Sequence, residues 1–250
     1  MWRHRIGLLY LFSLLSGLIL WELVAGQFSR VVLSPPTAVA YHLFLKTRSL
    51  ELPRLLLQSS GHMLLGYALA MAAAVPLGFL MGRSETVFRM FDPVVNAIYA
   101  VPTIAFVPFL IIWFGLFFPG RTALVFLMCV FDMLVTVSAG ARNVDRGLLD
   151  VGRSFGADRW QMVSRVLLPA SLPFLFTALR IGMVRAVIAM VTAELFFAAV
   201  NLGAYMQAAA NRFDSAGLLA VLAILAALGL AAQEGIKALE ARLLPWHVRH

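Results

Sequence analysis

The chain alternates between six long apolar stretches and shorter polar segments. The apolar stretches cover residues 6–25, 61–82, 91–118, 122–140, 173–200 and 215–235. A helix needs about 20 apolar residues to cross the hydrocarbon core of a bilayer, and long apolar runs are strong signals in a single sequence. The pattern therefore predicts an all-α integral membrane protein with about six transmembrane helices.

The first apolar stretch has two interpretations. Arg3 and Arg5 precede it, and residues 24–26 resemble a signal-peptide cleavage site. Its length of about 20 residues exceeds the ~7–15 apolar residues of a signal peptide, which favours a retained helix.

The segment between the first two stretches is expected to lie outside the membrane. It carries Ser34-Pro35-Pro36-Thr37, and prolines at this place suit the start of a helix. Residues 37–45 then form either a short helix at the outer surface or an ordered loop. We expect residues 1–57 to hold the first helix and this outer segment, and residues 58–240 to form a single membrane domain.

Composition and charge support a membrane location. The chain is 62% hydrophobic and 13% charged, whereas soluble domains are roughly 45–50% apolar and about 25% charged. The net charge is +8, but no dense basic run with interleaved aromatic residues indicates nucleic-acid binding. With the N-terminus inside, 12 of the 20 Lys and Arg residues fall in cytoplasmic segments and six in outer ones. This excess predicts that both termini are cytoplasmic.

Small residues recur at every fourth position of the second stretch. They are Gly66, Ala70, Ala74, Gly78 and Gly82. Helices in lipid associate through close backbone approach along such ridges. The ridge therefore predicts a helix interface, and we interpret it as support for a dimer of membrane subunits.

Prolines interrupt the third stretch. Pro102 and Pro108 are expected to kink the helix. Because a kink frees backbone carbonyls toward a cavity, these prolines and Thr103 are candidates for lining a translocation path. A purely structural kink is the alternative.

Ionisable residues inside the apolar stretches are costly and therefore informative. Asp132, Arg180, Arg185 and Glu194 are the candidates for a translocation path. Depths counted along the helices at about 1.5 Å per residue predict that Asp132 pairs with Arg180 or Arg185. Glu194 lies near the outer end of its span, where it reaches headgroups or water, or contacts a gate or substrate.

The longest polar segment between the later stretches, residues 142–172, is expected in the cytoplasm. It predicts a helix over 145–155, a break at Gly156 and a second helix over 159–167 that ends at Leu168-Pro169. No Walker glycine loop, catalytic set or metal-ligand spacing of histidines occurs in the sequence. We therefore expect no catalytic residue, no metal site and no cofactor in this chain.

This segment resembles the EAA loop of permease subunits of binding-protein-dependent ABC importers. Asp150-Val151-Gly152 stand in the place of the E-A-A triad, Gly156 is the loop glycine, and Val166-Leu167-Leu168-Pro169 follow at the family spacing. Asp replaces Glu, and Val and Gly replace the two alanines. The resemblance implies that the ATPase-coupling residues are Asp150, Val151, Gly152, Arg153, Gly156, Ala157, Arg159, Leu168 and Pro169.

Further motifs resemble the permeases for nitrate, sulfonates, taurine and related solutes. They are the run from Pro102 to Pro108 with Ala105 between them, Trp113-Phe114-Gly115, Leu179-Arg180-Ile181-Gly182, Ala193-Glu194 and the stretch 242–247. The resemblance implies a type I ABC importer permease in a bacterial cytoplasmic (inner) membrane, with a small solute as substrate.

The resemblance also implies partners. These are a second permease subunit, with a homodimer favoured, two ATPase subunits that bind ATP, and a periplasmic or lipid-anchored substrate-binding protein. A proton-coupled secondary transporter is the alternative, although such proteins usually have more spans and internal repeats.

Overall fold

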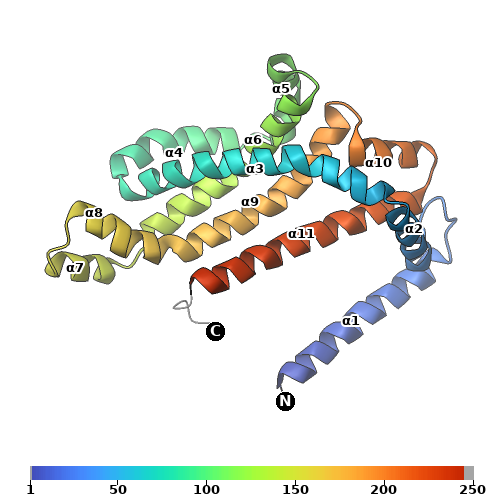
Figure 1. Ribbon diagram of the computed structural model, residues 1–250, viewed down its shortest axis with the longest axis horizontal. Helices are drawn as coiled ribbons and strands as arrows, with labels where there is room; N and C mark the ends of the chain where they lie inside the picture. Colours follow the sequence, from blue (N-terminus) through green and yellow to red (C-terminus); the bar gives the residue numbers. More distant parts are fainter. Residues whose placement is uncertain (1, 245–250) are drawn as a thin grey trace. The chain divides into compact units, whose positions relative to one another are not determined.

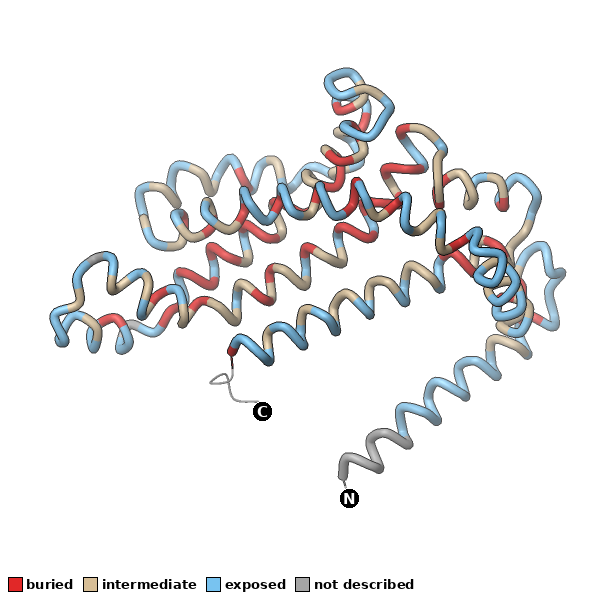
Figure 2. The backbone as a smooth tube through the Cα atoms, viewed as in Figure 1, coloured by how far each residue is buried: buried red, intermediate tan, exposed pale blue. Residues whose placement is uncertain are grey.

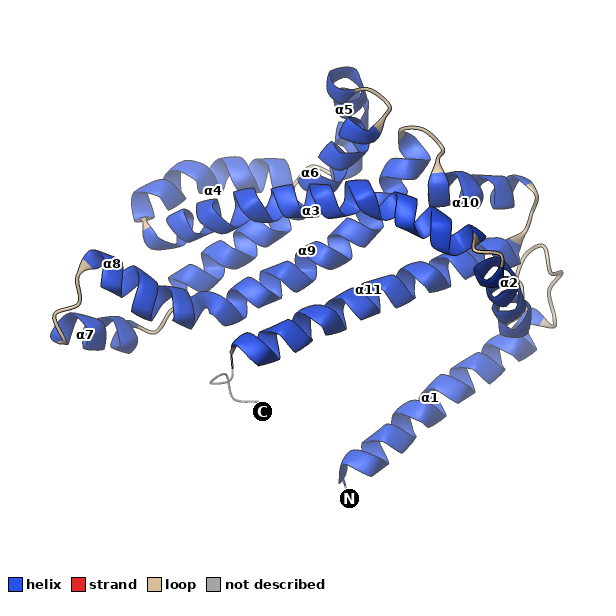
Figure 3. Ribbon diagram, in the orientation of Figure 1, coloured by secondary structure: helices blue, strands red, loops and turns tan. Residues whose placement is uncertain are grey.

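The computed structural model describes residues 2–244, and helices without any β-strand make up this part of the chain (Figures 1 and 3). The α-helices are α1 (Trp2–Ala25), α2 (Pro36–Arg48), α3 (Glu51–Arg83), α4 (Glu85–Tyr99), α5 (Val107–Phe114), α6 (Phe118–Arg142), α7 (Arg146–Ser154), α8 (Arg159–Gln161), α9 (Leu168–Phe196), α10 (Asn201–Asn211) and α11 (Ser215–Leu243). A 3-10 turn, η1 (Thr103–Phe106), precedes α5, and a π-helical segment, η2 (Met162–Leu167), joins α8 to α9. The all-α prediction is confirmed.

Within residues 2–244, four helical segments are long and apolar enough to cross a membrane, namely α3, α6, the continuous run Met162–Phe196 and α11. The pair formed by α4 and the segment Thr103–Phe114 counts as a fifth if it is one broken span. The expected first span falls in α1, whose described apolar part, Leu9–Ala25, is shorter than the others. Each of the predicted apolar stretches therefore lies largely in helix. Residues 245–247 of the C-terminal motif fall outside the described part.

The third stretch is broken rather than merely kinked. The two halves meet at an angle of 88°. Pro102 precedes η1, and Pro108 occupies the first turn of α5. Neither position requires a backbone N–H for a helical hydrogen bond, so proline is tolerated at both.

The second helix of the predicted cytoplasmic element does not end at Leu168-Pro169, so this expectation was wrong. Helical structure continues from α8 through η2 into α9. The Leu168 N–H donates to the Val163 carbonyl, one residue further back than in an α-helix. Pro169, which has no N–H, follows at the point where the register returns to α-helical, so the missing donor does not break the helix.

The chain folds into two compact units. The first unit contains the chain up to Gln58 together with Ala199–Ala226, and the second contains Ser59–Ala198 and the chain from Ala227 on. The expected boundary at residues 57 and 58 stays a prediction about domains.

Polar contacts hold the first unit together. The Thr37 hydroxyl donates to Glu22 Oε1 on α1 (2.8 Å), and His42 on α2 hydrogen-bonds the Tyr205 hydroxyl on α10 (2.6 Å). Partial burial raises the pKa of Tyr205. Lys46 Nζ donates to Glu51 Oε2 (2.7 Å), and this bond raises the pKa of Lys46.

Of the two interpretations of residues 37–45, the helix is confirmed.

The second unit is built around α6 and α9, which carry most of its buried residues (Figure 2). The small-residue ridge of α3 packs against α6 of the same chain. A Cβ on Gly66 would lie 2.6 Å from Val125 Cβ, and one on Gly78 would lie 2.9 Å from the Leu134 carbonyl oxygen. Ala70 is fully buried. The ridge is confirmed as a helix interface, but it offers no support for a dimer because this chain already covers it.

Candidate functional site

The helix–glycine–helix element lies at one end of the second unit, where α6 finishes and α9 begins (Figure 1). Asp145 caps the start of α7 by accepting a hydrogen bond from the Gly147 N–H (2.8 Å). The end of α7 is a Schellman motif. In it the Gly156 N–H donates to the Arg153 carbonyl (2.9 Å) and the Ala157 N–H to the Gly152 carbonyl (3.1 Å).

The chain reverses at Gly156, where φ is +74°. Glycine adopts this left-handed conformation without the steric cost that a Cβ brings. An added Cβ would meet no atom within 4 Å. The backbone conformation, rather than lack of space, therefore explains the glycine that was expected at this position.

A capping box begins the second helix. The Gln161 N–H donates to Asp158 Oδ1 (2.8 Å), and the Asp158 N–H donates to Gln161 Oε1 (3.1 Å). Gly152 of α7 faces this helix, since an added Cβ would lie 2.9 Å from Met162 Cε. Both ends of the turn are thus fixed by hydrogen bonds, and α7 lies close to η2.

The element has a buried face and an exposed apolar face. Val144, Leu149 and Leu167 form a small core beneath it. On the outside, Phe155 is 87% exposed and Trp160 is 75% exposed. The other coupling candidates are distributed around them: Val151, Leu168 and the Asp150–Arg153 ion pair are exposed, Gly152, Ala157 and Pro169 are half-buried, and Arg159 begins α8.

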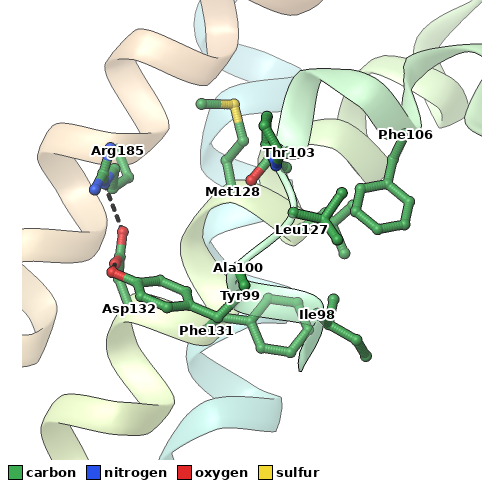
Figure 4. A pocket seen from close by; sticks show the side chains of 12 residues that line it. Ile98, Tyr99, Ala100, Thr103, Phe106, Leu127, Met128, Phe131, Asp132 and Arg185 are labelled. Carbon is green, nitrogen blue, oxygen red and sulfur yellow. Dashed lines mark hydrogen bonds and ion pairs between the residues drawn. The ribbon is translucent and has the colours of Figure 1, made fainter. Parts of the chain in front are cut away.

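A cavity of about 340 Å³ lies in the second unit, where the break between α4 and α5 faces α6 and α9 (Figure 4). Its lining consists of Ile98, Tyr99, Ala100, Val101, Pro102, Thr103, Phe106, Leu127, Met128, Phe131, Asp132 and Arg185. Four of the predicted path residues are therefore brought together. Pro108, Arg180 and Glu194 do not line this cavity.

Asp132 and Arg185 form an ion pair inside the cavity. Arg185 Nε lies 2.5 Å from Asp132 Oδ2, and the Tyr99 hydroxyl donates to Asp132 Oδ1 (2.8 Å) (Figure 4). Asp132 is 9% exposed and Arg185 is 45% exposed. Both carboxylate oxygens therefore have a donor, while the guanidinium remains accessible.

The predicted pairing of Asp132 is confirmed with Arg185. Arg180 instead lies on the side of α9 that meets α11, where its Nη1 is 3.4 Å from Glu240 Oε2. Residues 180 and 185 are five positions apart, so they face directions about 140° apart on a helix of 3.6 residues per turn. Depth along the helix could not distinguish them.

Glu194 is fully buried, so it does not reach headgroups or water as one expectation held. Its Oε1 lies 4.0 Å from Nε2 of His62 on α3, which is also buried. His62 was not among the site residues expected from the sequence. Its position offered a signal, because residue 62 is four residues before Gly66 and continues the packing ridge.

Tyr99 was also missed. Its position three residues before Pro102 and at the last residue of α4 places its hydroxyl at the helix break.

Among the residues that the structure describes, no group of three or more His, Cys, Asp or Glu side chains could hold a metal ion.

Solved structures share this fold. A structure of the methionine ABC transporter MetNI in an inward-facing conformation superposes with a TM-score of 0.63 at 18% sequence identity. The match covers 77% of this chain and 98% of that one. At this identity the likeness establishes the fold.

Sequence relatives extend the match. The taurine transport system permease protein TauC of Escherichia coli (strain K12) is 33% identical over 178 residues, which are 71% of this chain and 65% of that protein. The formylaminopyrimidine transport permease protein ThiX of Halalkalibacterium halodurans is 30% identical over 233 residues, 92% of each chain. The model of the family "binding-protein-dependent transport system inner membrane component" matches residues 74–244. The chain belongs to this family and is a permease of the ABC importer type.

Proposed function

We propose that this chain, together with a second copy of itself, forms the path by which an ATP-driven importer carries a small solute into a bacterial cell. Two separate ATPase subunits bind ATP and dock on the element around Gly156. A substrate-binding protein outside the membrane delivers the solute, and both termini lie in the cytoplasm. Membership of an inner-membrane transport family supports this assignment.

The exposed aromatic pair on the helix–glycine–helix element is the observation that carries the proposal. Aromatic side chains dominate the binding energy of many protein interfaces. Phe155 and Trp160 are exposed on an element whose turn is held by a Schellman motif and a capping box. A fixed apolar surface of this kind suits a permanent partner, because little conformational entropy is lost on docking.

The proposed solute is a sulfonate-, nitrate- or taurine-like molecule or a related small organic solute. A permease named for taurine is among the relatives. The accessible Arg185 guanidinium in the cavity supplies a partner for an anionic group. We propose that Pro102, Thr103, Asp132 and Arg185 contact the path, and that Pro108, Arg180 and Glu194 support the helices that surround it.

A proton-coupled secondary transporter was the alternative. The family match favours an importer driven by a separate ATPase. Transport that depends on ATP and is insensitive to a collapsed proton gradient would distinguish the two mechanisms in proteoliposomes.

The proposed homodimer is supported by the family resemblance alone, because the small-residue ridge on α3 is covered by α6 of the same chain. Native mass spectrometry of the purified complex measures the stoichiometry. Two copies of this chain with two ATPase subunits are expected, and one copy with two ATPase subunits would contradict the homodimer.

Alanine variants test the docking surface. In the complex reconstituted with its ATPase and binding protein, Phe155→Ala and Trp160→Ala should each weaken ATPase association by about tenfold or more, as expected for interface anchors worth over about 1.4 kcal/mol. Phe44→Ala is the matched control, because Phe44 is an exposed aromatic residue on α2. Normal ATPase association and normal transport in both variants would contradict the proposed coupling site.

A further inference from the structure

The cavity beside the helix break contains one positive and one negative side chain. Asp132 and Arg185 are the only charged residues among the 12 that line it, and they are paired with each other. Tyr99 and Thr103 add two hydroxyl groups, and the other lining residues are apolar (Figure 4). The cavity is therefore electrically neutral before any solute enters.

The affinity of a site with one paired positive and negative charge depends on the charges of the solute. A simple anion can reach the exposed nitrogens of Arg185, but it then adds a second negative charge close to the Asp132 carboxylate. The two negative charges repel each other, and the repulsion is strong because Asp132 is only 9% exposed and little water screens it. A simple cation beside Asp132 is repelled by the Arg185 guanidinium in the same way. An uncharged solute cannot replace either interaction.

A solute with both charges avoids this cost. Its cationic group can bind the Asp132 carboxylate while its anionic group binds the Arg185 guanidinium, so that each charge of the solute lies beside a protein charge of opposite sign. The volume of about 340 Å³ lies near the lower end of the ~300–1,000 Å³ typical of small-molecule sites. A small molecule with closely spaced opposite charges fits both the size and the charges.

From this arrangement we infer that the cavity is a binding site selective for small zwitterions, with Asp132 holding the cationic group and Arg185 the anionic group. The inference rests on the proposed import function and narrows its solute from sulfonate-, nitrate- or taurine-like molecules and related small organic solutes to those that carry both a negative and a positive group. Asp132 determines the specificity, since it opposes binding of an anion that brings no cation.

Direct binding to the purified permease–ATPase complex tests the inference without the binding protein. The probes are taurine, which has an ammonium and a sulfonate, ethanesulfonate, which lacks the ammonium, and ethanolamine, which lacks the sulfonate. Isothermal titration should show that taurine binds at least about tenfold more tightly than either of the others, since about 1.4 kcal/mol corresponds to tenfold. Equal affinity for taurine and ethanesulfonate, or no binding of taurine, would overturn the inference.

Variants assign the selectivity to Asp132. Asp132→Asn should reduce the preference for taurine over ethanesulfonate to less than about threefold, because the site then has no carboxylate to attract the ammonium or repel the unpaired anion. Glu240→Gln is the matched control: it neutralises the acid of the Arg180 pair, which does not line the cavity, and should leave the preference unchanged. Asp132→Asn with an unchanged preference would also overturn the inference.

Two further measurements keep the result interpretable. Tyr99→Phe retains both charges of the cavity and should therefore retain the preference for taurine. This variant remains informative if Asp132→Asn fails to fold. Loss of the preference in Tyr99→Phe would show that the charge pair is not its origin. ATP-dependent uptake by the reconstituted wild-type complex reports on the import function separately. Uptake without taurine selectivity in the cavity refutes only the inference, whereas absence of ATP-dependent uptake refutes the proposed function.

Discussion

Gly82 on α3 lies directly against Ala141 on α6. A Cβ added to Gly82 would overlap the Ala141 Cβ and lie 2.8 Å from the Ser138 carbonyl oxygen. Both neighbours belong to a tightly packed helix and cannot move like the end of a flexible side chain. Close approach of the two backbones at this point stabilises the pair of helices, since packing rather than burial from water drives helix association in lipid.

Gly82→Ala should therefore destabilise the protein. Overpacking of a tight contact typically costs about 1–3 kcal/mol. The measurement is the thermal unfolding midpoint of the detergent-solubilised protein, which should fall.

Gly229→Ala on α11 is the matched control, because an added Cβ there meets no atom within 4 Å. It should leave the midpoint unchanged or raise it, since alanine favours a helix interior by roughly 0.5–1 kcal/mol over glycine. If the two variants were equally stable and Gly82→Ala also lost self-association, the small-residue ridge would be an interface between subunits rather than between helices of one chain.

The turn at Gly156 depends on backbone conformation. Gly156→Asn should retain most coupling, because asparagine tolerates the left-handed region better than other non-glycine residues. Gly156→Pro should abolish coupling, since proline fixes φ near −65° and cannot adopt the observed +74°. The readout is stimulation of ATPase activity by the loaded binding protein in proteoliposomes.

Membrane insertion of both Gly156 variants should be normal, because the turn lies between helical spans rather than inside one. Equal ATPase stimulation in the Asn and Pro variants would show that the left-handed turn has no part in coupling.

The capping box should set the local stability of the same element. Asp158→Ala removes the acceptor for the Gln161 N–H, and loss of an N-cap costs about 0.5–2 kcal/mol. Faster hydrogen exchange of the amides near residues 158–162 is expected. Asp150→Ala is the control on the neighbouring helix: it removes an ion pair to Arg153 in which both side chains are 69% exposed, and such pairs contribute little. Faster exchange in both variants to the same extent would argue against a specific role of the cap.

The sequence predicted the helices well because long apolar runs need no knowledge of tertiary contacts. The bend near Pro102 and the glycine turn at Gly156 were predictable for a similar reason, since each follows from the local chemistry of one residue, although the bend proved to be a full break of 88°. The expected stop at Pro169 failed because a π-helical register shift placed the proline where no N–H is needed. A sequence gives no direct sign of such a shift.

The sequence predicted where residues lie along the helices better than it predicted which residues they contact. The ridge on α3 indicated an interface but not which helix fills it, because small residues permit close approach by any neighbour. Glu194 looked accessible from its place near a helix end, yet α3 covers it through His62. Asp132 required a partner, but rotation about the helix axis, which depth does not report, decided between Arg180 and Arg185.

Arg180 and Glu240 should couple α9 to α11. The Nη1–Oε2 distance is 3.4 Å, and the two side chains are 29% and 17% exposed. Arg180→Gln leaves the Glu240 carboxylate without this partner, and Glu240→Gln does the same to the guanidinium, so each single change should destabilise the protein. The double variant should lose less stability than the sum of the two single losses, because it leaves neither charge unpaired. Coupling energies of contacting pairs are typically about 0.5–3 kcal/mol. Chemical unfolding of the four proteins in one detergent measures the cycle, and strictly additive losses would show that the pair does not join the two helices.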